Sequence, residues 1–400
     1  MFTPKFSIAW LSRSLLAAAL TALPAAASAQ APGPGRLAPP TAETLFQQAF
    51  ELQQAGDTLG AIQTYLASLN LEPDNAGARS NLGAAYVQLG RYDDAIAEYR
   101  RAIDLDPDNV AFRFNLGLAH YKAARVPDAA DAFADVVQRE RGHLNARLLL
   151  ADCYLQMGRY QDVVDLLALY EEEFAGNLAY AYVLGTAFIE TERPEHGQRL
   201  IDRIFAGGES AEGHLLMATA LMAGGDNPKA LESLEKAATL NPRLPLVHSL
   251  MGRALLRTGD QAGAAKAFLT ELQNNPNDFQ ANLEIGDLKK RDQRFDEAEP
   301  YITRALRMRP DDLTARFSLA GLHVSRGETD EARTVLEAIV ADAPTFVEAH
   351  VLLATVYYRL QRREDGDRVR ATIERLNAEA QAKQPGSRAT AAPTPGSSPP

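Results

Sequence analysis

The feature that most constrains this chain is a segment of 34 residues that recurs along most of its length in constant phase. Residues 76–109, AGARSNLGAAYVQLGRYDDAIAEYRRAIDLDPDN, show the pattern clearly. Apolar residues recur at spacings of three and four in each half, which predicts one helix ending at Gly90 and a second ending before Pro107. Because two helices cannot bury both of their apolar stripes alone, the segment predicts a stacked array.

The same frame fits ten consecutive units, with a single 33-residue step between the fifth and sixth. The units begin at Ala42, Ala76, Val110, Leu144, Leu178, Ala211, Pro245, Phe279, Leu313 and Val347. The eighth place is always glycine or alanine, as at Gly83 and Ala151, which indicates close helix contact. Because alanine already fills this place in other units, we expect Gly83→Ala to be tolerated and Gly83→Leu to be destabilising.

The period and its small and apolar positions resemble the tetratricopeptide repeat, over about residues 42–380. The resemblance implies an all-α fold, a right-handed α-α superhelical solenoid of about ten 34-residue helix-turn-helix repeats. It also implies that the first helices of successive units line a concave groove. This family is defined by stacking rather than by chemistry, so the resemblance implies peptide or protein partners without naming one.

Capping and turn residues agree with the frame. Thr41 precedes the first helix, and residues suited to N-capping precede six later first helices: Asn75, Asn109, Asn177, Ser210, Asp278 and Asp312. Glycines that enter left-handed backbone at low cost stand in the turns of six units: Gly56, Gly90, Gly158, Gly225, Gly259 and Gly327. The local signals therefore support the same helix boundaries as the apolar pattern.

The ends of the chain differ from the repeats. Residues 1–29 combine Lys5 and Arg13 with an apolar run at 15–23 and a small-residue site ending at Ala29, which predicts a signal peptide and a periplasmic or secreted protein. A transmembrane anchor is disfavoured because the run is about half of the ~20 residues that span a bilayer. We expect a Pro/Gly-rich linker at 30–41 and a disordered tail at 381–400.

The repeats are predicted to form two arms, 42–210 and 211–380. The fifth unit, which precedes this boundary, is one residue short. It has Pro194 and Gly197 where its second helix should begin, and it ends at Gly207-Gly208. Proline and glycine both lower helix propensity, so we expect a joint between Ala206 and Ala211.

Charge and cysteine content exclude several classes of function. The formal charge of −11 becomes −13 if Lys5 and Arg13 are removed with the signal peptide, whereas nucleic-acid binding requires clustered positive charge. We therefore expect no nucleic-acid partner, and no membrane insertion of the mature chain. A single cysteine, Cys153, excludes an internal disulfide and a cysteine-based metal site.

No familiar catalytic motif is present. The sequence contains no phosphate-binding GxxxxGK[ST] loop, no HExxH and no GxSxG, and no two of its seven histidines lie three or four residues apart. We therefore expect neither catalytic residues, nor a metal, nor a cofactor. An enzyme without a familiar motif is the least favoured alternative.

The groove is the predicted binding site. Fifteen residues at groove places of their units are expected to contact a partner: Phe46, Phe50, Phe114, Tyr121, Tyr182, Ile189, Leu215, Met222, Arg253, Leu256, Arg257, Asp287, Lys290, Phe317 and Tyr358. Some family members hold a peptide carboxylate with a lysine and asparagines. Asn81 and Asn115 match such a place, but Ser80 and Phe114 stand where the lysine would be.

Two functions follow from this surface. The first is an exported scaffold that binds a peptide or protein partner in its groove, where apolar and aromatic residues suit an extended peptide or an amphipathic helix. The alternative is a structural component of an envelope assembly or polysaccharide-export complex, which would use its convex faces.

The signal-peptide interpretation gives a direct prediction. The mature protein should begin at Gln30 and should show tyrosine emission only, because Trp10 is the single tryptophan and would be removed. N-terminal sequencing and fluorescence of exported material measure both. Tryptophan emission from that material would contradict cleavage.

Overall fold

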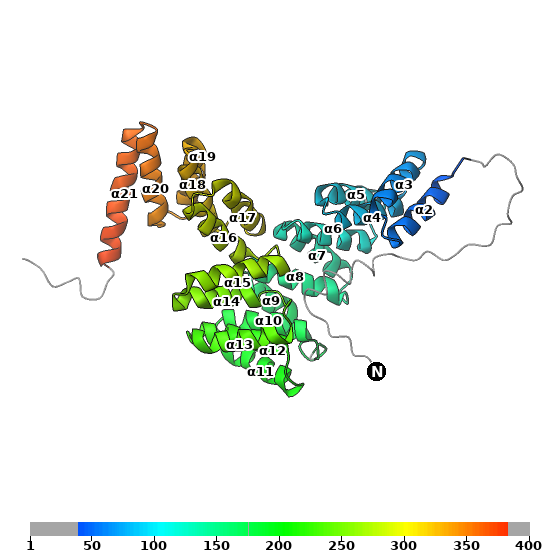
Figure 1. Cartoon of the computed structure of the whole chain (residues 1–400), viewed down its shortest axis with the longest axis horizontal. Helices are drawn as coiled ribbons and strands as arrows, with labels where there is room; N and C mark the ends of the chain where they lie inside the picture. Colours follow the sequence, from blue (N-terminus) through cyan, green and yellow to red (C-terminus); the bar gives the residue numbers. More distant parts are fainter. Residues whose placement is uncertain (1–38, 175, 383–400) are drawn as a thin grey trace, which may run out of the picture. The chain divides into compact units, whose positions relative to one another are not determined.

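The computed structural model describes residues 39–174 and 176–382, and all regular secondary structure in these ranges is helical (Figure 1). The predicted signal peptide, most of the predicted linker and residues 383–400 lie outside the described ranges. Consecutive helices pair and pack on the next pair. The prediction of an all-α repeat array is therefore confirmed.

The first helices of the ten repeats are α2 (Ala42–Gln54), α4 (Ala76–Gln88), α6 (Val110–Lys122), α8 (Leu144–Gln156), α10 (Leu178–Glu190), α12 (Ala211–Ala223), α14 (Val247–Thr258), α16 (Phe279–Arg291), α18 (Leu313–Arg326) and α20 (Val347–Arg359). The second helices are α3 (Thr58–Leu71), α5 (Tyr92–Leu105), α7 (Val126–Arg139), α9 (Tyr160–Leu167) with the 3-10 turn η1 (Ala168–Tyr170), α11 (Pro194–Ala206), α13 (Asn227–Leu240), α15 (Gln261–Asn274), α17 (Phe295–Met308), α19 (Thr329–Asp342) and α21 (Arg363–Ala382). Every predicted unit except the seventh begins at the first residue of a helix.

The predicted caps and turns are present. Asn75 Oδ1 accepts the N–H of Ala78 at 2.9 Å, and the other predicted caps accept equivalent bonds. All six turn glycines have positive φ. The same place in the other four repeats holds residues that also have positive φ: Ala124, Glu192, Gln293 and Gln361. The turn therefore requires left-handed backbone in every repeat, including the four repeats that have no glycine at this place.

One contact recurs inside the helix pairs, between the small eighth residue and the large twenty-fourth. A Cβ atom on Gly83 would lie 2.9 Å from Tyr99 Cε1, and one on Gly117 would lie 2.6 Å from Phe133 Cε1. Where the eighth residue is alanine, the twenty-fourth is leucine in three repeats: Ala151/Leu167, Ala218/Leu234 and Ala320/Leu336. Size at one place thus offsets size at the other in these pairs. Among the repeats with alanine at the eighth place, the exceptions are Ala49 with Tyr65 and Ala354 with Arg370.

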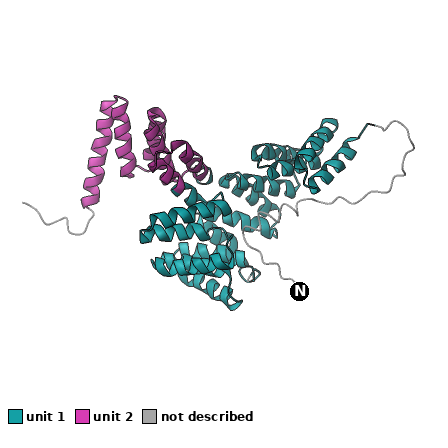
Figure 2. Ribbon diagram, viewed as in Figure 1, with its two compact units in different colours: residues 1–284, 307–309 teal, residues 285–306, 310–400 magenta. Residues whose placement is uncertain are grey.

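The described chain divides into two compact units (Figure 2). Unit 1 runs to Glu284 and includes Arg307–Arg309, and unit 2 comprises Ile285–Leu306 and the residues from Pro310. The division does not fall at the joint expected near 206–211. One buried hydrophobic cluster extends from Leu148 to Ala254 across that point, because α10 packs directly on α12.

The seventh repeat begins irregularly. Proline stands at 245, Leu246 has a φ of 73°, and α14 begins only at Val247. The Glu271 carboxyl oxygens on α15 accept the N–H groups of Leu246 at 2.8 Å and Ser249 at 3.3 Å, and so cap a helix that has no side-chain cap of its own. Burial, and then the nearby charge of Asp278, raise the pKa of Glu271 to about 8.

The contact between Gly83 and Tyr99 predicts a size-dependent coupling. Contrary to the expectation from sequence, Gly83→Ala should destabilise the fold by about 1–3 kcal/mol, because the new methyl group overlaps the Tyr99 ring. Combining it with Tyr99→Leu should recover part of the loss, since Ala151 and Leu167 form that pair natively. Urea unfolding of the two single variants and the double variant measures the coupling. Strictly additive losses would contradict the contact.

The raised pKa of Glu271 predicts a pH-dependent stability. Between about pH 4.5 and pH 8 the unfolded chain loses the Glu271 proton while the folded chain retains it, so this group lowers the free energy of unfolding as pH rises. Each unit of pKa shift corresponds to about 1.4 kcal/mol. Glu271→Gln should flatten the fall in urea midpoint across that window, whereas Glu235→Gln, at an exposed site on α13, should not. Parallel pH profiles for the wild type and Glu271→Gln would contradict the assignment.

Candidate functional site

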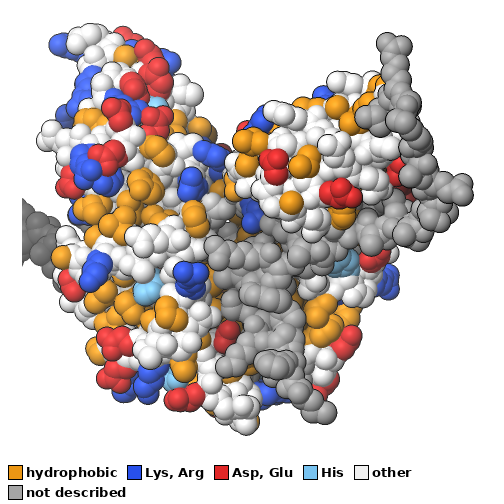
Figure 3. Space-filling model, turned by 45° about the vertical axis from the view of Figure 1, so that its right-hand side comes forward, with side chains coloured by type: hydrophobic (Ala, Val, Ile, Leu, Met, Phe, Trp, Pro, Cys, Tyr) orange, Lys and Arg blue, Asp and Glu red, His pale blue; other side chains and the backbone are white. Residues whose placement is uncertain are grey.

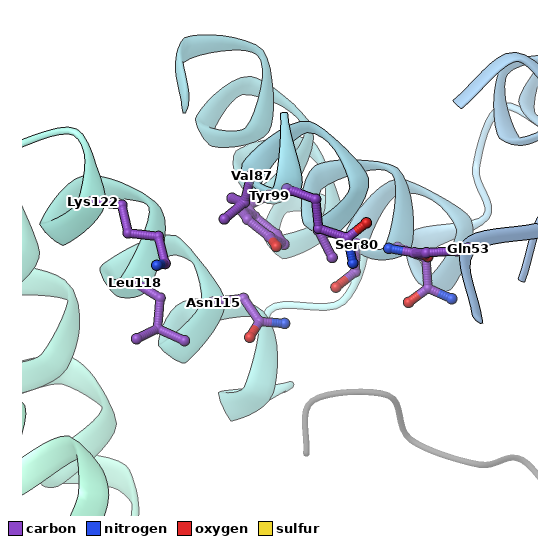
Figure 4. Close-up of a pocket in the computed structure, with 10 residues that line it drawn as sticks. Gln53, Ser80, Val87, Tyr99, Asn115, Leu118 and Lys122 are labelled. Carbon is purple, nitrogen blue, oxygen red and sulfur yellow. The ribbon is translucent and has the colours of Figure 1, made fainter. Parts of the chain in front are cut away.

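A pocket lies on the first-helix face of the three N-terminal repeats (Figure 4). Its lining comes from α2, α4, α5 and α6 and consists of Gln53, Ser80, Asn81, Ala84, Val87, Gln88, Tyr99, Asn115, Leu118 and Lys122. Four of the ten side chains are carboxamides, so we refer to this site as the amide pocket.

Two of the amides are oriented by a buried tyrosine. The Tyr65 hydroxyl donates to Gln53 Oε1 at 3.0 Å, and the Asn81 side chain hydrogen-bonds to the same tyrosine. Tyr65 is fully buried, and burial raises the pKa of its hydroxyl, so it remains a protonated donor. The repeat core therefore sets the orientation of groups that face the groove.

The remaining lining combines an apolar floor with polar edges. Ala84, Val87 and Leu118 supply the floor, while Asn115 supplies a third amide from the next repeat. Lys122, in the last turn of α6, is the one charged residue among the ten. A carboxamide carries both a donor and an acceptor, so rows of them can match the N–H and C=O groups of another chain.

The structure places the fifteen predicted groove residues in three groups. Five are buried between helices: Phe114, Tyr182, Ile189, Leu215 and Met222. Seven are half-buried: Phe46, Phe50, Tyr121, Arg253, Asp287, Lys290 and Phe317. Three are exposed: Leu256, Arg257 and Tyr358. None of the fifteen lines the amide pocket.

Four of the five buried residues lie on α10 and α12, where Tyr182 and Leu215 are at most 2% exposed. These helices, LAYAYVLGTAFIE and AEGHLLMATALMA, are apolar on nearly every side. A helix without a polar face is buried all round. The apolar composition of these two helices could have predicted their burial from sequence. Assigning groove residues by their place in the unit, in the same way for every repeat, overlooks it.

Several of the predicted polar contacts are satisfied inside the chain. Lys290 Nζ lies 2.6 Å from Asp287 Oδ1 and 3.1 Å from Ser318 Oγ. The Tyr358 hydroxyl donates to Asp367 Oδ1 at 2.7 Å, and the Tyr121 hydroxyl donates to Asp152 Oδ2 at 2.5 Å. These groups mainly hold neighbouring helices together.

A second, apolar surface lies in unit 2 on α18 and α20. It is lined by Phe317, Val347, Glu348, Val351, Leu352 and Thr355. Val351 is 49% exposed, and the rings of Phe317 and Phe346 lie 5.4 Å apart. The predicted residue Phe317 therefore belongs to an accessible apolar surface.

The amide pocket had a partial signal in the sequence. Asn81 and Asn115 share the sixth place of consecutive units, whereas a lysine is missing at Ser80 and Phe114. The structure brings Lys122 to the pocket from the thirteenth place of the third repeat. Place-by-place comparison could not find it, because the lysine lines the pocket from a different turn of the helix.

The described residues contain no cluster of His, Cys, Asp or Glu arranged to hold a metal ion. No helix in the same ranges combines the length and the apolar character needed to cross a bilayer. On the face drawn in Figure 3, basic side chains stand among acidic and hydrophobic ones.

Comparison with known families agrees with this architecture. Models of the TPR repeat match residues 51–90 and 83–123, and models of the tetratricopeptide repeat match residues 121–185, 215–279 and 291–356. These matches cover more than half of the 400 residues. The molecule is a helical-repeat scaffold, and the chain belongs to the tetratricopeptide-repeat family.

No curated protein matches the chain. Among solved structures, it is similar to the first TPR of Spaghetti (RPAP3) bound to the HSP90 peptide SRMEEVD. That similarity has 19% sequence identity and a TM-score of 0.29, and it covers 30% of this chain and 94% of the other.

Proposed function

We propose that this protein is an exported, non-catalytic scaffold that binds an extended peptide segment of a partner protein in the groove of its N-terminal repeats. The observation that supports the proposal is the amide pocket, in which Gln53, Asn81, Gln88 and Asn115 surround an apolar floor. Membership of a family of interaction scaffolds supports the same class of function.

The chemistry of the pocket favours a peptide over other ligands. Carboxamides pair with main-chain amides of any sequence, while the floor of Ala84, Val87 and Leu118 accepts small apolar side chains. Because Lys122 is the only charged lining residue, a neutral or acidic segment should bind better than a basic one.

The lining also supports a non-catalytic role. It contains hydroxyls at Ser80 and Tyr99 but no histidine, cysteine or carboxylate that could serve as a general base. Binding, rather than bond cleavage, is what these side chains can provide.

Export is part of the proposal and rests on the pattern of residues 1–29, with cleavage after Ala29 and a periplasmic or secreted destination. The N-terminal sequence of the mature protein tests it independently of any partner.

The binding proposal is tested with the full chain and a displayed library of random peptides. Selected peptides should be enriched in neutral or acidic sequences, and Asn81→Ala combined with Asn115→Ala should weaken them on the order of tenfold or more, since each lost hydrogen bond costs about 0.5–1.5 kcal/mol. Isothermal titration measures the change.

The matched control is Asn70→Ala, which removes an exposed asparagine from the second helix α3. It should leave the affinity unchanged. Selected peptides that bind the double variant as tightly as the wild type would place the binding site elsewhere.

A further inference from the structure

Within unit 1 the chain returns to the groove side of its own earlier repeats. Asn277, in the loop between α15 and α16, donates from Nδ2 to the carbonyl oxygens of Tyr121 and Lys122, each at 3.2 Å. The partners lie 156 and 155 residues apart in sequence. These hydrogen bonds therefore join the end of the seventh repeat to the first helix of the third repeat.

A second contact lies beside the first. Arg309 donates from Nε to the carbonyl oxygen of Gln156, the last residue of α8, and its guanidinium lies 4.1 Å from the centre of the Phe279 ring. The carbonyls at the end of a helix lack helical partners and carry partial negative charge. Asn277 and Arg309 thus supply side-chain donors at the carboxyl ends of α6 and α8.

The two helix ends are tied to each other by partly buried side chains. Asp152 Oδ2 accepts from the Tyr121 hydroxyl at 2.5 Å and from Gln156 Nε2 at 2.7 Å, and Gln156 Nε2 lies 2.9 Å from the same hydroxyl. The two acceptor sites therefore form one rigid surface, so Asn277 and Arg309 act on the same element.

The groove is covered over the repeats enclosed by this closure. In the fifth and sixth repeats the second, fifth and ninth places, which face the groove in this family, are occupied by Ala179, Tyr182, Thr186, Glu212, Leu215 and Thr219, none of which is exposed. In the tenth repeat the same places hold Glu348, Val351 and Thr355, all of which are exposed. Tyr182 is 2% exposed, compared with 49% for Val351.

Charged groups from the two parts of the chain that the Asn277 and Arg309 contacts join both influence Tyr182 electrostatically. Burial is the main cause of its raised pKa, and the charges of Asp152 on α8 and Glu271 on α15 add to it. The carboxylate of a seventh-repeat helix therefore lies near the groove face of α10.

We propose that Asn277 and Arg309 form a latch that holds the groove shut over the fifth and sixth repeats, and that release of the latch exposes this part of the groove. The latch contacts named above are polar, so water can replace them without dismantling a helix pair. This inference goes beyond the proposed function, and its test requires no peptide.

Accessibility of a cysteine at the covered face tests the latch in the full chain. Thr219→Cys, in a chain that also carries Cys153→Ala, places a near-isosteric thiol on α12 at the ninth place of the sixth repeat. Adding Asn277→Ala and Arg309→Met should raise its rate of reaction with an aromatic disulfide reagent on the order of tenfold or more. The radius of gyration from solution scattering should also increase.

Matched variants separate release of the latch from general loosening. Asn274→Ala and Arg316→Met remove local bonds, to the Pro242 carbonyl and to Asp342, and should leave the rate unchanged. Thr355→Cys, at the ninth place of the tenth repeat, should react rapidly with or without the latch. Arg309→Lys, combined with wild-type Asn277, retains a donor and should remain closed.

Circular dichroism establishes that the helices are intact in each variant. If the double variant loses helicity, Asn277→Asp replaces it, because a carboxylate facing two carbonyls repels them without changing side-chain size. A Thr219→Cys rate and a radius of gyration that stay at wild-type values in a folded latch variant would overturn the proposal.

Discussion

The contact between a small residue at the eighth place of a repeat and a large residue at the twenty-fourth is the interaction on which most of the helix pairs depend. Gly83 meets Tyr99, and Gly117 meets Phe133, at distances that leave no room for a methyl group. This approach allows the two helices of a pair to bury a ring between them. Dense packing of this kind makes the size of one partner a condition on the other.

A helix pair built in this way still has uncovered apolar surface, which the next pair must bury. Towards the ends of the array the first helices line two sites, with amides on α2, α4 and α6 at one, and an aromatic ring on α18 with aliphatic groups on α20 at the other. In the middle, α10 and α12 are apolar on nearly every side and are buried on their groove face as well. The accessible parts of the groove therefore differ in chemistry, so they suit different segments of a partner.

Much of the fold could be predicted because its rules are local. The unit starts, the capping residues such as Asn75 and the left-handed turns such as Gly90 all depend on interactions within one repeat. The candidate site was harder to predict. Asn81 and Asn115 were visible as a repeated pair, but Lys122 joins them from a different place, and the pocket exists only where three first helices lie together.

The sequence by itself determined the helix pairs, their boundaries and their order, because hydrogen bonds, caps and apolar stripes act between residues fewer than 34 positions apart. Only the tertiary structure decided which part of the groove is open. The burial of Tyr182, the exposure of Val351 at the same place of its unit, and the contact of Asn277 with Tyr121 across 156 residues do not follow from the repeat pattern. In a repeating sequence pattern every unit looks equivalent. The burial of a given unit depends instead on which other repeats pack against it in the folded chain.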